Sequence, residues 1–215
     1  DLINLNVTLD NYMQLIKLAD YIQVTNVDVL IDAIVQIKNI HCVTEFEEFY
    51  KLSPRLKPLT REELKAVIAH WVRNEVSCFT KYGHISYWDV SNVTDMSCMF
   101  HGSIFNGDIS KWDVSNVIDM SFMFNNSKFN GDISNWDVSK VMEMDYMFNS
   151  SIFNGDISNW DVYNVTLMKS MFTYSNFDGD ISKWNVSRVT NMSFMFNSSK
   201  FNGDISKWDV SNVTD

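Results

Sequence analysis

The sequence predicts an α+β chain, in which a helical N-terminal segment is followed by a parallel β-solenoid of 24-residue coils. Two observations predict this architecture. From Ile85 onward the chain contains five complete copies of one 24-residue repeat and part of a sixth. Residues 9–75, which precede the repeats, carry apolar residues at helical spacing. A fixed period of this length is typical of solenoids, in which each repeat buries its apolar face by stacking on its neighbours. We therefore expect a helical segment or solenoid cap over residues 1–79 and a repeat solenoid over residues 85–215.

Helices are expected across the N-terminal segment because apolar residues recur there at i, i+3, i+4 and i+7, which places them on one helical face. The three series are Tyr12, Leu15, Ile16, Ala19 and Ile22; Val27, Leu30, Ile31, Ile34 and Ile37; and Leu64, Val67, Ile68, Trp71 and Val72. A short junction over residues 77–84 is then expected to lead into the repeats.

Two helix starts have a chemical signature. Thr44 with Glu47, and Thr60 with Glu63, have the spacing of a capping box. In this motif the hydroxyl and the carboxylate satisfy backbone N–H groups that the first turn of a helix leaves without partners. Both prolines of the chain lie between the two starts, where they separate the helices.

Apolar residues return at the same position of every repeat, and we call each set of positions 24 residues apart a column. The constant apolar columns include Trp88, Trp112, Trp136, Trp160, Trp184 and Trp208; Met96, Met120, Met144, Met168 and Met192; Phe100, Phe124, Phe148, Phe172 and Phe196; and Phe105, Phe129, Phe153, Phe177 and Phe201. Apolar residues at a strict structural period fill an interior before they bind anything, so we expect these columns to form the core.

The pattern within one coil predicts its path. Ile-Ser-x-Trp-Asp-Val alternates apolar and polar residues as a half-buried strand does, and Val-Thr-x-Met alternates over a shorter span. Met-Ser-x-Met-Phe spaces its apolar residues as one tight helical turn. Phe-Asn-Gly-Asp closes the coil, and we expect its glycine to take a positive φ. These glycines are Gly107, Gly131, Gly155, Gly179 and Gly203.

Charge excludes some partners. The formal net charge is −10; residues 1–84 hold 9 Lys/Arg against 11 Asp/Glu, and residues 85–215 hold 8 against 16. Because an acidic repeat array repels phosphate groups, we expect neither nucleic acid nor an anionic membrane as a partner. No apolar run approaches the roughly 20 residues of a spanning helix, so we expect no membrane span.

Two columns of aspartate would stack like charge on like charge. They are Asp108, Asp132, Asp156, Asp180 and Asp204, and Asp89, Asp113, Asp137, Asp161 and Asp209. We expect turn N–H groups to hold these carboxylates, with calcium as the alternative. Asn185 stands in the second column in place of aspartate, which favours hydrogen bonding. The asparagines of the Phe-Asn-Gly-Asp corner are expected to hydrogen-bond the turn or one another.

We expect no catalytic activity, no cofactor and no metal. No nucleotide-binding, zinc-protease or serine-hydrolase motif occurs in the chain. His41, Cys42, Cys78 and His84 could be imagined as zinc ligands, but their spacing matches no standard site. The three cysteines are an odd number without the spacing of a disulfide framework.

We expect the function to depend on columns whose residue varies between repeats while the neighbouring columns stay constant. Candidate partner-binding residues are Tyr87, Phe122, Tyr146, Tyr174 and Phe194. Exposed aromatic side chains on a rigid, extended face are how repeat proteins engage partners. The alternative is that these columns face solvent and have drifted, since surface positions tolerate change.

The repeat F-N-G-D-I-S-x-W-D-V-S-x-V-T-x-M-x-x-M-F resembles the BspA-like variant of the leucine-rich repeat, the tandem repeat of mycoplasma lipoproteins. Five consecutive copies match nearly every position, and Asn185 and Asp178 are among the few departures. The resemblance implies a right-handed, leucine-rich-repeat-like solenoid that serves binding or adhesion. Repeats of this kind also occur in bacterial surface proteins and in large DNA viruses.

The stretch Leu5–Ile37 resembles the C-terminal half of a BTB/POZ or Skp-type adaptor domain, with Leu18-Ala19-Asp20-Tyr21-Ile22 at the family's helix motif. Thr60–Leu64 resembles the start of the Skp family's closing helix. The resemblance implies an adaptor that docks a ubiquitin-ligase subunit. Adaptor-like helices beside these repeats are most similar to large-virus proteins.

The leading hypothesis is a protein-interaction module, in which the repeats recruit a target and the N-terminal helices dock an adaptor or a ubiquitin-ligase subunit in the cytoplasm, which is the host cytoplasm if the protein is viral. The alternative is an adhesion or structural protein at the cell surface, whose helices only cap the solenoid. The repeats stop within a copy and no polar capping unit follows, so we expect the chain to be a segment of a longer protein.

Overall fold

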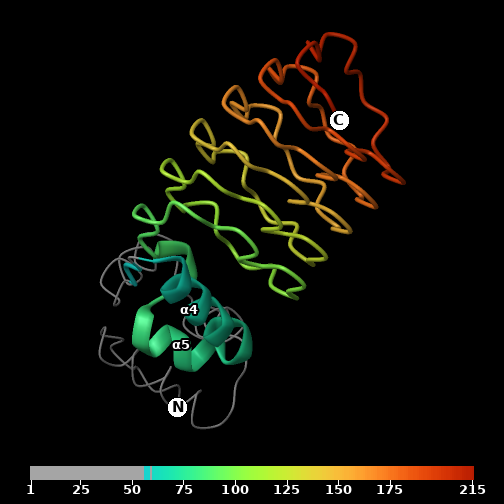
Figure 1. The fold of residues 1–215 in the computed structure, drawn as a ribbon. Coiled ribbons are helices and arrows are strands. Elements are labelled where there is room, and N and C mark those ends of the chain that lie inside the picture. The colour runs from blue at the N-terminus through green and yellow to red at the C-terminus, as the bar shows by residue number, and fades with distance from the viewer. Residues whose placement is uncertain (1–55, 59) are drawn as a thin grey trace, which may run out of the picture. The chain divides into compact units, whose positions relative to one another are not determined.

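The computed structural model describes residues 56–58 and 60–215 (Figure 1). Within them lie α4 (Arg61–Arg73), α5 (Glu75–Tyr82) and the 3-10 helix η1 (Ile85–Tyr87). The helices expected over 9–37, the capping box at Thr44 and the adaptor-like stretch Leu5–Ile37 lie outside the described residues.

The described chain divides into two compact units. Residues 56 and 66–88 belong to the first unit, and residues 57–58, 60–65 and 89–215 belong to the second. The first unit therefore contains α5, η1 and most of α4, whereas the second contains the start of α4 and nearly all of the repeats.

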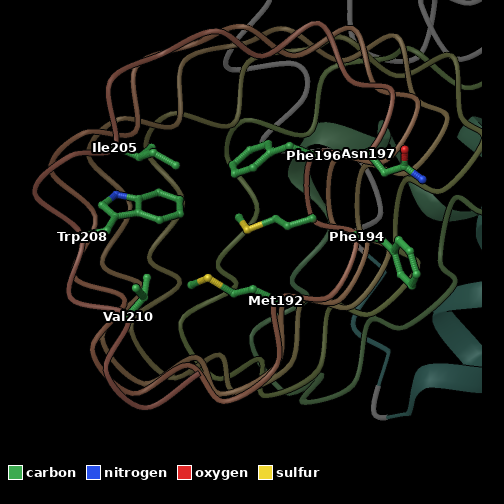
Figure 2. Close-up of a pocket in the computed structure, with 8 residues that line it drawn as sticks. Met192, Phe194, Phe196, Asn197, Ile205, Trp208 and Val210 are labelled. Atoms are coloured by element: carbon green, nitrogen blue, oxygen red, sulfur yellow. The ribbon is translucent and has the colours of Figure 1, made fainter. Parts of the chain in front are cut away.

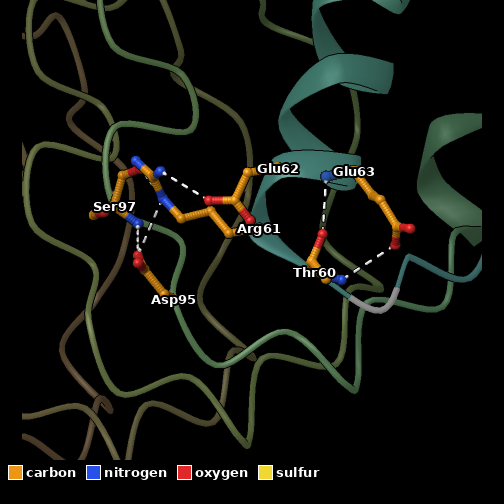
Figure 3. A network of polar contacts seen from close by, with 6 residues as sticks. All are labelled: Thr60, Arg61, Glu62, Glu63, Asp95 and Ser97. Atoms are coloured by element: carbon orange, nitrogen blue, oxygen red, sulfur yellow. Dashed lines mark hydrogen bonds and ion pairs between the residues drawn. The ribbon is translucent and has the colours of Figure 1, made fainter.

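The predicted capping box begins α4. The backbone N–H of Glu63 donates to Thr60 Oγ1 at 3.2 Å, and the backbone N–H of Thr60 donates to Glu63 Oε2 at 3.3 Å (Figure 3). Two N–H groups of the first turn are thus satisfied by side chains. Glu62 and Glu63 also place negative charge at the positive end of the helix dipole.

The apolar face of α4 is mostly as predicted. Leu64, Val67, Ile68 and Trp71 are buried, whereas Val72 is 37% exposed. Val72 follows Trp71 directly, and one residue turns a helix by about 100°, so its side chain leaves the buried face. The prediction for Val72 is therefore wrong.

The expected junction over residues 77–84 is wrong, because α5 occupies most of it. Asn74 caps this helix by accepting a hydrogen bond from Ser77 N–H at 2.9 Å. Gly83, with φ of 73°, ends it and donates its N–H to Phe79 O at 2.8 Å. Cys78 and Phe79 of this helix are fully buried.

The repeats form a stack of coils, shown from green to red in Figure 1. Their interior is built from the predicted columns: the tryptophan, methionine and both phenylalanine columns are buried throughout the inner coils. Phe124 illustrates the packing, because its ring stacks on Phe129 of its own coil at 4.4 Å and on Phe148 of the next coil at 5.6 Å. The predicted core is confirmed.

The prediction of an α+β fold with a leucine-rich-repeat-like parallel β-solenoid is wrong. The described residues contain no β-strand and no sheet; neighbouring coils share only isolated parallel bridges, such as Asp95 with Asp119 and Asp119 with Glu143. Tight turns replace the expected strands. In the segment predicted as the main strand, the N–H of Trp112 bonds back to the carbonyl of Ile109 at 3.1 Å, so the chain turns where an extended strand was expected.

Backbone hydrogen bonds join the coils nonetheless. On one side of each coil, alternate N–H groups donate to carbonyls of the following coil. Phe122 N–H donates to Asp145 O at 2.8 Å, and Phe124 N–H donates to Met147 O at 3.0 Å. Each residue therefore lies beside its equivalent in the next repeat.

The corner asparagines form the predicted ladder. The backbone N–H of each corner residue donates to the side-chain oxygen one coil earlier, as Asn154 does to Asn130 Oδ1 at 2.8 Å. Asp178, which replaces asparagine, accepts from Asn202 N–H at the same distance. The ladder therefore needs a side-chain oxygen rather than an amide.

The corner glycines do not have the expected positive φ. Among the described glycines only Gly83 and Gly102 do. The corner needs glycine for space, because a Cβ on Gly155 would lie 2.8 Å from ring carbons of Phe153, two residues earlier. The chain thus folds tightly over a buried ring.

We expect Gly155→Ala to destabilise the protein by about 1–3 kcal/mol, because the added methyl group overpacks against a fully buried ring. Thermal unfolding followed by circular dichroism measures the loss. The matched background is Phe153→Leu, in which the clash is removed, so Gly155→Ala should cost less there. Equal costs in both backgrounds would contradict the steric explanation.

Candidate binding face of the coil stack

One of the columns that vary has an unusual backbone conformation. Cys98, Phe122, Tyr146, Ser170 and Phe194 occupy one column, and all five have φ between 53° and 59°. This left-handed region favours glycine and asparagine, and a bulky residue there costs of order 1 kcal/mol. The turn imposes the conformation in every coil, but nothing in the turn requires an aromatic side chain.

Two of the predicted site residues come together in this column. The rings of Phe122 and Tyr146 stack with centroids 4.6 Å apart and planes 9° apart. Both side chains are partly exposed. Lys169 lies over Tyr146, with Nζ 6.0 Å from the centroid of the ring. A preformed aromatic surface therefore spans two neighbouring coils.

The other predicted site residues do not join this pair. Ser170 is buried and interrupts the aromatic column between Tyr146 and Phe194. Phe194 and Tyr174 are exposed by 65% and 63%. Tyr87 lies in η1 within the first compact unit, where its ring is 6.5 Å from that of His84.

Sequence reasoning missed two apolar residues beside the aromatic pair. Ile118 and Met142 are each 45% exposed and stand one above the other in a column that otherwise holds threonine, as at Thr94 and Thr166. Comparing that column residue by residue would have found them. An exposed apolar residue in place of threonine is not needed for the turn.

Carboxylates lie between these apolar residues and the aromatic pair. Asp119 and Glu143 form a parallel bridge through their backbones, and Asp145 precedes Tyr146. Desolvation, reinforced by the charges of Asp119, Asp145 and Asp95, raises the pKa of Glu143. Burial also raises the pKa of Asp145, although a hydrogen bond from Lys169 N–H opposes the shift. The carboxylates of this surface therefore repel one another.

We call these seven residues the Phe122 face. They are Ile118, Asp119, Phe122, Met142, Glu143, Asp145 and Tyr146.

The first coil shows that an arginine can bind at the position equivalent to Asp119. Arg61 Nη2 and Nε donate to Ser97 O at 2.7 and 3.1 Å, and Nε lies 3.3 Å from Asp95 Oδ1 (Figure 3). In the second coil the equivalent carbonyl belongs to Ser121, and it accepts a hydrogen bond from the N–H of Cys98 in the first coil. The guanidinium therefore supplies the first coil with the donor that a preceding coil would give.

A family model described as "Mycoplasma protein of unknown function, DUF285" matches residues 70–176 and 150–215. The chain belongs to this family. The match confirms the predicted resemblance to mycoplasma-type tandem repeats. It does not reach Leu5–Ile37, so the adaptor and large-virus resemblances stay predictions. No curated protein and no solved structure matches the chain.

In this DUF285 array the aspartate columns are held as predicted, by turn N–H groups. Asp108 Oδ1 accepts from the N–H and the hydroxyl of Ser110 at 2.9 and 2.7 Å, and the other coils repeat this arrangement. Asn185 preserves it, because its Oδ1 accepts from the N–H of Ser187 at 3.2 Å. As with the corner ladder, the oxygen rather than the charge is what the turn needs.

No metal-binding group forms in the part of the chain that the structure describes. His84 Nδ1 lies 2.7 Å from Ser86 Oγ, and Cys78 Sγ contacts Val67 O at 3.7 Å. Burial raises the pKa of Cys78 to about 12, so its thiol stays protonated at neutral pH. His41 and Cys42 lie outside the described residues.

The last coils leave an apolar concave surface (Figure 2). Met192, Phe196, Ile205, Trp208 and Val210 line it, and they belong to columns that the following coil covers throughout the inner stack. Phe194 lies on the outer side of the same coil (Figure 2). This surface is therefore the side of the last coils that corresponds to the buried interior of the inner coils.

Neither α4 nor α5, the α-helices of the described chain, is long and apolar enough to cross a membrane.

We expect the melting temperature to fall as the pH is lowered from about 5 to about 3. Hydrogen bonds from the serine two residues later hold a set of aspartate pKa values below the ordinary 3.8. These are Asp132, Asp137, Asp156, Asp180, Asp204 and Asp209. The stability from these carboxylates is present above their unfolded pKa and is lost as the pH falls toward the folded values.

Glu143 and Asp145 act in the opposite direction, because their folded pKa values are raised and their protonation favours the folded state. The control is therefore Glu143→Gln with Asp145→Asn, in which the acid-induced fall should begin at a higher pH. A melting temperature independent of pH over this range would contradict the role assigned to the turns.

Proposed function

We propose that the protein is a non-enzymatic protein-interaction module, and that the Phe122 face of the coil stack binds its target. The interior of the stack is filled by constant columns, so the residues free to encode a function lie outside. Phe122 and Tyr146 are the observation that carries the proposal. They stack at left-handed positions where folding favours glycine or asparagine, and they remain partly exposed.

Aromatic pairs of this kind suit recognition. Large rigid rings contribute contact area at low entropic cost, and interface hot spots are enriched in such residues. Rows of residues on neighbouring coils also form the extended surfaces through which repeat proteins bind. Ile118 and Met142 enlarge the apolar area beside the pair.

What the N-terminal segment adds is a separate part of the proposal. If the adaptor resemblance of Leu5–Ile37 holds, these helices dock a ubiquitin-ligase subunit in the cytoplasm. The alternative is an adhesion protein at the cell surface, whose helices only cap the array. Both versions use the same face for the target.

We expect Phe122→Asn with Tyr146→Asn to reduce target capture at least about tenfold, because truncating an aromatic hot spot costs 2 kcal/mol or more. Asparagine suits the left-handed turn, as Asn126 with φ of 51° shows, so the fold should be retained. The measurement is quantitative mass spectrometry of proteins captured on the intact chain, with circular dichroism to verify folding.

The matched control is Tyr163→Ser. Tyr163 is 46% exposed and stands in a column of serines, so this variant also removes an exposed ring without disturbing a turn. Identical capture by all folded variants would refute the Phe122 face as the binding surface. Ligase subunits retained by every variant would support the adaptor version, and surface proteins lost with the face would support adhesion.

A further inference from the structure

We propose that the Phe122 face takes an arginine-bearing segment of its partner, with the guanidinium stacked on the side of the Phe122 ring that faces away from Tyr146 and bonded to the neighbouring carboxylates. This inference rests on the proposed function and names the chemistry of the target. It follows from the arrangement of apolar, acidic and aromatic residues across two coils.

The register of the two coils brings these residues together. The N–H groups of Met120 and Phe122 donate to the carbonyls of Glu143 and Asp145 at 2.9 and 2.8 Å, so segments 118–122 and 142–146 run side by side. Ile118 is therefore next to Met142, Asp119 next to Glu143, and Phe122 next to Tyr146. The carboxylates lie between an aliphatic border and an aromatic border.

The charges of Asp119 and Glu143 on this surface are uncompensated. Within the described part of the chain no lysine or arginine forms an ion pair with Asp119 or Glu143. Lys169 is the cation near Asp145, and Asp95 is paired with Arg61. A cationic partner would relieve the repulsion among these carboxylates, whereas an anionic partner would add to it.

Arginine fits better than lysine because the face offers both of the surfaces that a guanidinium uses. Its planar fork bonds carboxylates and its flat face stacks on aromatic rings, whereas an ammonium is a strongly hydrated point charge. The chain itself provides both precedents. Arg61 binds Asp95 in the same column as Asp119, and the guanidinium of Arg188 lies 5.4 Å from the ring centroid of Tyr163.

The test measures binding of the intact chain to a fluorescent peptide of alternating arginine and glycine, with lysine–glycine and glutamate–glycine peptides of equal length for comparison. Fluorescence anisotropy at near-physiological salt gives the affinities. We expect the arginine peptide to bind several-fold more tightly than the lysine peptide. No binding is expected for the glutamate peptide.

Two variants of equal charge locate the site. Asp119→Asn with Glu143→Gln should weaken binding of the arginine peptide about tenfold. Asp113→Asn with Asp137→Asn removes the same charge elsewhere and should weaken it less than about twofold. Asparagine is native to both aspartate columns, at Asn191 and Asn185, where its oxygen accepts the same turn hydrogen bond. Both variants should therefore fold.

Equal weakening by the two variants would overturn the inference, since the peptide would then sense only the general charge. Equal affinity for lysine and arginine peptides would overturn it as well. The inference can fail while the proposed function stands: if the arginine peptide does not bind while Phe122→Asn with Tyr146→Asn still abolishes target capture, the face binds a partner of other chemistry.

Discussion

The structure depends on the backbone hydrogen bonds that join each coil to the next. Because N–H groups such as that of Phe122 donate to the carbonyl 23 residues later, every residue lies beside its equivalent in the next repeat. A column that faces inward must therefore pack well against itself. Phenylalanine does so by stacking, as Phe124 does on Phe148 with planes 7° apart. The constancy of the interior columns is a consequence of this register.

The same register places like charges together on the outside. Turns resolve most of this conflict, because a carboxylate that accepts the N–H and hydroxyl of the serine two residues later is held in its charged form. Asn185 and Asp178 show that the turn and the ladder need an oxygen and not a particular charge. The acidic character of the array is thus partly a by-product of turn chemistry. Asp119 also caps a turn, but Glu143 does not follow that rule; desolvation, together with the charges of neighbouring carboxylates, raises its pKa.

The sequence is informative about what is buried and misleading about how the backbone runs. The 24-residue period identifies the core correctly, and the capping box at Thr60 is confirmed because it depends on local chemistry alone. The β-solenoid is wrong because Ile-Ser-x-Trp places apolar residues inward equally well through a tight turn. Similarly, Gly155 is required by the ring of Phe153 and not by its own φ, a cause that only the packed coil reveals. At the site, Phe122 and Tyr146 were identified as candidates from their variable column, whereas Ile118 and Met142 were overlooked in a column of threonines.

The location of the aromatic pair argues for a confined site and against a continuous adhesive stripe. The left-handed column accepts a cysteine at Cys98 and a buried serine at Ser170, so the fold does not require rings there, and the stack of rings extends over two coils only. The threonine column varies at the same two coils, where isoleucine and methionine replace threonine, and the serine column departs at Asp145 in the second of these coils and at Lys169 in the coil after it. Independent departures that coincide in space indicate a common cause outside the repeat itself. Because the turns and the inter-coil hydrogen bonds hold the backbone beneath these side chains, a partner would meet a preorganised surface and little ordering entropy would oppose its binding.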